Sequence, residues 1–146
     1  MGRVMNNRYI IVNPIFIFIL SMVFSPVYAG EIPKVLLHVT SSSQTIHQNA
    51  LNNVDALLKK YGKGNIIVEI VANSGGVGIA NVKNRINGKV SSLLGEGIRL
   101  SVCSTTLTKM KNSGTLIPLV EGTNHVPNGT IRVVELQQQG YLYIRP

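Results

Sequence analysis

The stretch KVLLHVTSSSQTIHQNALNNVDALLKKYGKGNIIVEIVAN, residues Lys34–Asn73, decides the fold of this chain. It opens with a short run of Leu and β-branched residues at 34–40 and closes with a second such run at 65–73, and both are typical of buried strands. Between them, apolar residues recur at helical spacing, and Gly62 supplies a stop. A crossover of helical length between two strands predicts parallel pairing in a right-handed βαβ unit.

The rest of the chain continues this alternation of short apolar runs with helix-length segments. In the first crossover, Thr45-x-x-Gln48 has the form of a capping box and predicts where that helix begins. Residues 79–94 keep a helical period that Asn87-Gly88 interrupts, which predicts two short helical pieces. A third strand is expected at 98–102, followed by a helix that begins within Ser104–Thr106, and NHVP at 124–127 predicts a brief fourth strand.

The segment NGTIRVVELQQQG at 128–140 carries conflicting signals. Its Ile and Val residues favour a strand, whereas the cap residue Asn128 and the terminal Gly140 favour a helix. We expect a helix at 130–138, because a parallel sheet needs a crossover before the final strand at 142–145. The whole pattern predicts one α/β domain.

The N-terminal residues have the features of a secretory signal peptide. Arg3 and Arg8 precede an apolar run at 9–24, and Val27-Tyr28-Ala29 suits signal peptidase. A retained membrane anchor is the alternative, but the run is shorter than the roughly 20 apolar residues of a spanning helix and contains Asn13-Pro14. We therefore expect a signal peptide at 1–29, a single domain at 30–146, a periplasmic or secreted location, and no membrane association after signal removal.

The charge of the chain does not indicate a nucleic-acid binder. The formal net charge is +8, but the Lys and Arg residues are scattered. Outside the signal peptide the aromatic residues are Tyr61, Tyr141 and Tyr143, which form a poor platform for stacking bases. A solvated basic surface is the simpler interpretation.

The sole cysteine, Cys103, stands in GIRLSVCSTTL at 97–107, where an expected strand leads into an expected helix. A thiolate at a helix N-terminus is stabilised by free amide donors and by the helix dipole, which lowers its pKa. A single cysteine cannot form an internal disulfide. In an oxidising compartment it is either buried and inert, or joined to another molecule, or present because it is reactive.

Other candidate chemistry is weaker. NSGGVG at 73–78 follows a strand, so its amides are placed to bind an anion, although a plain tight turn explains the same residues. His38, His47 and His125 match no standard metal-ligand spacing. We therefore expect no metal and no other cofactor.

Several segments together resemble the DsrE/DsrF-like family of sulfur-handling proteins: VLLHV, LLKKYG, VCSTTL, HVPNG and the ending ELQQQGYLYIRP. The resemblance covers nearly all of Lys34–Pro146. It implies a three-layer α/β/α fold with a mostly parallel five-stranded sheet in the order 4-3-2-1-5, and frequent oligomerisation. In the active members of the family a cysteine carries sulfur as a persulfide, and the family's cysteine motif falls on Cys103 here. The best-understood members are cytoplasmic, so the signal peptide makes this chain an exported member and leaves their relay partners in doubt.

Two functions follow from these observations. The first is an exported thiol protein, either a carrier or a sulfurtransferase, that accepts and transfers sulfane sulfur on Cys103. Its partners would be a sulfur donor or acceptor protein, or a small sulfur compound, and further copies of itself. The second is a non-catalytic oligomeric binding domain with a packed cysteine. For the first, we expect the charged sulfur to be held by Ser104, Thr105 and Thr106, with Ser74, Gly75 and Gly76 as a neighbouring wall.

His38 is not expected to act as a base for this thiol. In the implied strand order, one strand lies between those that carry His38 and Cys103, so the two backbones are roughly 10 Å apart. A direct hydrogen bond is then not expected.

Overall fold

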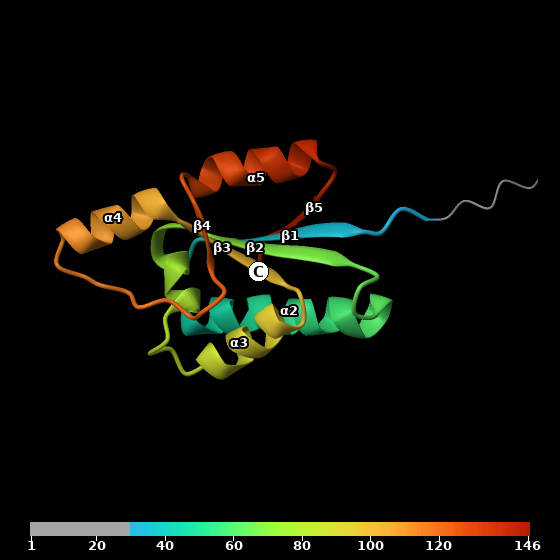
Figure 1. The fold of residues 1–146 in the computed structure, drawn as a ribbon, viewed down its shortest axis with the longest axis horizontal. Helices are drawn as coiled ribbons and strands as arrows, with labels where there is room; N and C mark the ends of the chain where they lie inside the picture. The colour runs from blue at the N-terminus through green and yellow to red at the C-terminus, as the bar shows by residue number, and fades with distance from the viewer. Residues whose placement is uncertain (1–29) are drawn as a thin grey trace, which may run out of the picture. The chain divides into compact units, whose positions relative to one another are not determined.

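Five strands form one sheet in the order β4-β3-β2-β1-β5, and all four pairings are parallel (Figure 1). The computed structural model describes residues 30–146, so the expected signal peptide lies outside the described residues. The α/β fold and the predicted strand order are confirmed. The strands are β1 (Lys34–Val39), β2 (Ile67–Ala72), β3 (Arg99–Cys103), β4 (Asn124–Val126) and β5 (Leu142–Ile144).

Helices lie on both faces of this sheet. In Figure 1, α2 and α3 lie on one side, α5 lies on the other, and α4 extends away from the end of β3. The first helix ends as predicted at Gly62, whose φ is 85° and whose amide donates to Leu58 O. The helices are α2 (Gln44–Tyr61), the 3₁₀-helix η2 (Ser74–Ala80), α3 (Asn87–Gly95), α4 (Ser104–Asn112) and α5 (Gly129–Gln138).

The two faces of the sheet are filled differently, because successive strand residues point to opposite faces. The face under α2 and α3 carries the large core, whose biggest fully buried members are Leu37, Leu51, Ile79, Leu93 and Leu100. The face under α5 carries the small core, which consists of Leu36, Val71, Val133, Leu136 and Tyr141. Burial of Val, Ile and Leu therefore fills the interior, as a chain without Trp requires.

The ambiguous segment at 128–140 is a helix, as predicted. Asn128 has an extended backbone, and its side-chain Oδ1 accepts hydrogen bonds from the amides of Thr130 and Ile131. The cap therefore outweighs the strand propensity of the Ile and Val residues.

The predicted capping box at Thr45 is wrong. The helix α2 begins at Gln44 with Ser43 as its N-cap, so Thr45 lies inside the first turn. Gln48 does not reach back to the cap, because its side-chain amide donates to Asn52 Oδ1 at 3.0 Å, one turn further along.

The two helical pieces expected at 79–94 are only partly right. The 3₁₀-helix η2 ends at Ala80, and Asn87-Gly88 begins α3 instead of interrupting a helix. Between them, Asn84 donates to Gly78 O at 3.0 Å and accepts from the amide of Ile86 at 3.3 Å. Asn side chains that bond nearby backbone groups favour turns over helix.

Within residues 30–146, no helix is both long enough and apolar enough to cross a bilayer.

Candidate functional site around Cys103

Cys103 is the last residue of β3 and the N-cap of α4, so it lies at the carboxyl edge of the sheet. Ligands gather at this edge in open α/β sheets. Its side chain is 5% exposed. On one side it pairs with Val126 of β4, and on the other Asn73 follows the end of β2. The thiol therefore lies between two strand ends and below the first turn of α5.

The pKa of the Cys103 thiol lies below its ordinary value of 9.0. Burial raises this pKa, but hydrogen bonds from the Thr106 hydroxyl and from the amides of Gly129, Thr106 and Thr105 outweigh the effect of burial. The donors come from two helix N-termini, those of α4 and α5. This geometry increases the thiolate fraction near neutral pH, and the thiolate is the nucleophilic form.

The N-terminus of α5 approaches Cys103 closely because residue 129 is a glycine. A Cβ at Gly129 would lie 2.9 Å from the Cβ of Asn73 and 3.3 Å from the Cβ of Cys103. A side chain at this position would force the helix away from the strand ends. The contact between the Gly129 amide and the sulfur therefore depends on the absence of a side chain.

Among the residues predicted to hold the sulfur, Thr106 has the most direct contact. Its hydroxyl bonds the thiol and also accepts a hydrogen bond from the Ser74 amide at 3.2 Å. The hydroxyl of Thr105 donates to Pro127 O at 2.8 Å instead, so Thr105 faces the sulfur through its amide. Ser104 lines a pocket of about 280 Å³ on α4 with several apolar side chains.

The predicted wall Ser74–Gly76 begins the 3₁₀-helix η2 and is linked to Cys103 through Ser74 and Thr106. The two glycines instead press against the β1–α2 connection. A Cβ at Gly75 would lie 2.7 Å from the amide nitrogen of Ser42, and one at Gly76 would lie 1.9 Å from Val39 O. Close backbone packing therefore explains why these residues are glycines.

A row of polar side chains follows the carboxyl edge of the sheet from β5 to β2. His38 Nε2 donates to Asn73 Oδ1 at 3.3 Å, and His38 Nδ1 accepts from the Tyr143 hydroxyl at 3.0 Å. Burial lowers the pKa of His38, the Asn73 hydrogen bond opposes this, and the charge of Arg145 adds to the lowering. Both ring nitrogens therefore have partners other than Cys103, in agreement with the separation expected from the strand order.

The other two histidines lie on separate elements. His47 of α2 is buried, and its Nε2 donates to Ser41 O at 2.8 Å, while His125 belongs to β4. In the part of the chain that the structure describes, no group of three or more His, Cys, Asp or Glu residues could hold a metal ion.

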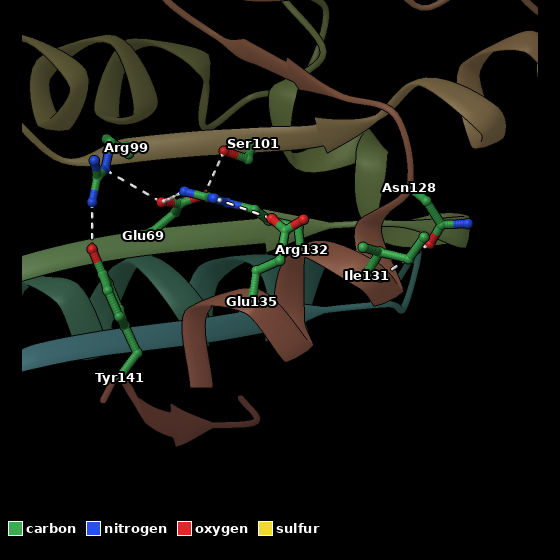
Figure 2. A network of polar contacts seen from close by, with 8 residues as sticks. All are labelled: Glu69, Arg99, Ser101, Asn128, Ile131, Arg132, Glu135 and Tyr141. Carbon is green, nitrogen blue, oxygen red and sulfur yellow. Dashed lines mark hydrogen bonds and ion pairs between the residues drawn. The ribbon is translucent and has the colours of Figure 1, made fainter. Parts of the chain in front are cut away.

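A network of charged residues joins α5 to strands β2 and β3 (Figure 2). Glu69 of β2 is fully buried, and its carboxylate accepts hydrogen bonds from Arg132 Nε at 2.8 Å and Nη2 at 2.9 Å. Ser101 donates to the same carboxylate at 2.8 Å, and Arg99 Nε lies 3.3 Å away. Burial raises the pKa of Glu69, but the hydrogen bonds from Arg132 and Ser101 and the charges of Arg132 and Arg99 outweigh it, so this pKa lies below its usual value.

Sequence reasoning missed the roles of Gly129, Asn73 and the Glu69–Arg132 pair. Gly129 had a signal, because the segment HVPNG is among those that resemble the family. Asn73 had a weaker one, as the polar residue that ends the strand next to that of Cys103. The Glu69–Arg132 pair is 63 residues apart in the chain, and nothing local joins its members.

Solved structures that are similar to this chain include the following two. MTH1491 from Methanobacterium thermoautotrophicum, described as a protein of unknown function, is 31% identical, with a TM-score of 0.69 over 78% of this chain and 99% of that one. The ychN protein from E. coli is 16% identical, with a TM-score of 0.55 over 77% of this chain and 96% of that one, and supports the fold alone. No family model matches the chain, and no curated protein matches it.

The identity to MTH1491 extends over almost the whole of that protein, and both similar structures have the DsrE-like arrangement. The family resemblance of the sequence segments and the observed strand order agree with it. The chain therefore belongs to the DsrE/DsrF-like family.

Proposed function

We propose that this protein is an exported sulfur carrier or sulfurtransferase that accepts and passes on sulfane sulfur as a persulfide on Cys103. The observation that carries the proposal is the convergence of hydrogen-bond donors from α4 and α5 on one thiol at the end of β3. Membership of the DsrE/DsrF-like family supports it.

The reaction needs one cysteine. The Cys103 thiolate attacks a sulfane sulfur of a polysulfide, a sulfur–sulfur bond of the polysulfide breaks, and the electron pair leaves with the shortened chain. Cys103 then carries a persulfide. In the second half, an acceptor thiolate attacks the outer sulfur, the acceptor becomes the persulfide, and the electron pair of the broken bond returns to Cys103 as thiolate. A disulfide oxidoreductase would need a second thiol, and this chain has one cysteine.

The groups that stabilise the thiolate also suit the charged persulfide. The outer sulfur of a persulfide carries negative charge, and amides at helix N-termini are donors for such a charge. The Thr106 hydroxyl is held in place by the Ser74 amide, so it is oriented before sulfur arrives. Ser104 and Thr105 complete the first turn of α4 around the same position.

Burial favours a second candidate function, a non-catalytic oligomeric binding domain. Cys103 is 5% exposed, and a buried free cysteine often serves only as a small apolar side chain. In that case the thiol would react with reagents only after unfolding.

Intact-mass measurement separates the two candidates. The protein is exposed briefly to polysulfide in the folded state, beside a Cys103→Ser variant as control. Added mass in multiples of one sulfur atom, seen only in the chain with Cys103 and removed by a thiol reductant, supports the carrier. No addition to the folded protein, together with alkylation of Cys103 only in denaturant, supports the binding domain.

Export and self-association are parts of the same proposal. Mass measurement of the protein secreted or exported by its host tests cleavage after Ala29, and an uncleaved N-terminus would contradict it.

Self-association is supported by α4, on which every side chain is at least partly exposed, and by exposed apolar residues elsewhere, namely Leu116, Ile131 and Leu142. Light scattering at micromolar concentrations is expected to give a small symmetric oligomer, and a monomer mass throughout would contradict this.

A further inference from the structure

The charged network on the α5 face includes Ser101, two residues before Cys103 on β3, but it contributes no donor to the thiol. We propose that the Glu69–Arg132 ion pair holds the first turn of α5 against the sheet so that the Gly129 amide meets Cys103. Glu69 and Arg132 are then positioning residues for the thiol. The inference rests on the proposed function in taking Cys103 as the reactive group, but its own test is a titration and not a transfer reaction.

The pair is a fixed connection between helix and sheet. Arg132 binds both carboxylate oxygens of Glu69, at 2.8 and 2.9 Å, in the two-pronged geometry that restricts orientation as well as distance. Glu69 cannot swing away, because it is fully buried and Ser101 and Arg99 hold it from β3. Figure 2 shows Arg132 reaching from α5 to this carboxylate.

The connection is transmitted to Gly129 through one turn of helix. The Arg132 amide donates to Asn128 O at 3.1 Å, and the Asn128 side chain caps the amides of Thr130 and Ile131. The Asn128 side chain therefore satisfies the amides of Thr130 and Ile131, while the Gly129 amide donates to the sulfur of Cys103. Because the turn is hydrogen-bonded throughout, fixing Arg132 fixes Gly129.

The apolar anchor of α5 lies further along the helix. Val133 and Leu136 pack in the small core, whereas Ile131 and Val134 are 58% and 50% exposed. A helix held only at Val133 and Leu136 would stay on the sheet but would be free to tilt at its N-terminus. Hydrogen bonds weaken steeply with distance and angle, so a small tilt would remove the Gly129 donor from the sulfur.

Loss of the Glu69 charge and displacement of α5 would shift the pKa of Cys103 in opposite directions, so the two effects can be told apart. Charged or titratable residues on the elements around Cys103 are Glu69 of β2, Arg99 of β3, His125 of β4, Lys109 and Lys111 of α4, and Arg132 and Glu135 of α5, with His38 on β1. The donors on the sulfur are all uncharged. In a Glu69→Met variant, Arg99 loses the counter-charge of Glu69, and Arg132 keeps only the 3.4 Å contact with Glu135. If charge mattered, this extra positive charge would stabilise the thiolate. If position matters, the thiolate loses a donor and is destabilised.

The test is the pH titration of the thiolate, followed by its far-ultraviolet absorbance with the Cys103→Ser protein subtracted. For Arg132→Met and Glu69→Met, we expect the midpoint to rise by about one pH unit, a roughly tenfold loss of thiolate at a given pH below it. Arg132→Lys, which keeps the charge but not the two-pronged contact, should give a smaller rise. Glu135→Gln is the matched control, because it removes only the 3.4 Å contact to Arg132 Nη1 and leaves the pair intact.

Circular dichroism shows which variants fold. If the single variants do not, a Glu69→Met, Arg132→Met double variant decides, because apolar residues of similar volume often replace a buried ion pair without loss of stability. An unchanged midpoint in a folded variant without the pair, or a lowered one in Glu69→Met, overturns the proposal. Sulfur uptake by the unmodified protein is measured separately, so a raised midpoint without uptake would reject the carrier function and keep the positioning role.

Discussion

The two faces of the sheet differ in what holds their helices. On the α2 and α3 face, the contacts are almost entirely apolar and form the large core. On the α5 face, one helix is held by the five residues of the small core and by a buried carboxylate with two arginines. Neighbouring residues of β2 show the contrast, because Ile70 belongs to the large core and Glu69 to the charged network.

The two faces therefore have different roles: one supplies stability and the other fixes the orientation of a helix. Apolar burial is favourable and not directional, so the α2 and α3 face can supply most of the stability without fixing any atom precisely. A two-pronged ion pair contributes less net stability, because burying charge is costly, but it fixes orientation. The thiol lies on the face where orientation is fixed.

The largest expected effect tests the apolar face. Leu51 of α2 is fully buried in the large core, so Leu51→Ala leaves a cavity and should lower the free energy of unfolding by about 2–5 kcal/mol. Denaturant unfolding followed by circular dichroism measures it. Lys60→Ala, at an exposed position of the same helix, is the control and should change little. Equal effects at the two positions would mean that the α2 and α3 face is not the main source of stability.

A smaller effect is expected from crowding on the α5 face. Gly129→Ala places a Cβ 2.9 Å from the Cβ of Asn73, and the displacement of the helix should cost about 1–3 kcal/mol. The same displacement removes a donor from Cys103, so the thiol titration midpoint should also rise. Gly88→Ala is the matched control, because a Cβ there meets nothing within 4 Å. A Gly129→Ala protein with an unchanged midpoint would show that α5 does not need to approach the sulfur so closely.

A third effect is a loss of stability in mild acid. Burial lowers the pKa of His38 and of His47, while the hydrogen bonds to Asn73 and Ser41 oppose it. Below the unfolded-state value of 6.5, the unfolded chain therefore binds more protons than the folded chain. The contribution of the two neutral histidines to stability is fully present above pH 6.5. As the pH falls from 6.5 toward the folded-state pKa values, the free energy of unfolding should decrease by at most about 1.4 kcal/mol per pH unit for each histidine.

The two histidines sharpen the comparison because they lie on different faces. His38 of β1 bonds Asn73 and Tyr143 at the carboxyl edge of the sheet, whereas His47 is a buried residue of α2 itself. Unfolding at neutral pH and at about pH 5, in the unmodified protein and in a His47→Gln variant, measures the share of His47. A free energy of unfolding that is higher at about pH 5 than at neutral pH would contradict the lowered pKa values of the two histidines.

The smallest effect is expected at an exposed ion pair. Lys89 Nζ lies 2.6 Å from Asp55 Oδ1, but the two side chains are 39% and 45% exposed. Such pairs typically contribute about 0–1 kcal/mol, so Asp55→Asn should change the free energy of unfolding by less than 1 kcal/mol and should leave the thiol titration unchanged. A larger loss than that of Arg132→Met would mean that burial does not distinguish the two pairs.

The fold was predictable because its signals are local and repeated. Apolar runs gave β1, β2 and β3 to within one or two residues, and the need for a crossover gave α5 against the propensity of its Ile and Val residues. The errors fell where a polar side chain can bond any of several groups close to it in the chain. Gln48 bonds Asn52 instead of capping α2, and Asn84 bends the chain between η2 and α3.

The sequence by itself determined the α/β class, the parallel order of elements and the position of Cys103 at a strand end before a helix. Those features follow from periodicity, from turn residues and from the rule that parallel strands need crossovers. Only the tertiary structure decided which groups meet the sulfur and which hold those groups in place. Thr106 is three residues from Cys103, but Gly129 and Asn73 come from other elements, and so does the Glu69–Arg132 pair that holds α5 on the sheet. Hydrogen bonds and ion pairs act over a few ångströms of space and not along the chain, so their partners are set by packing.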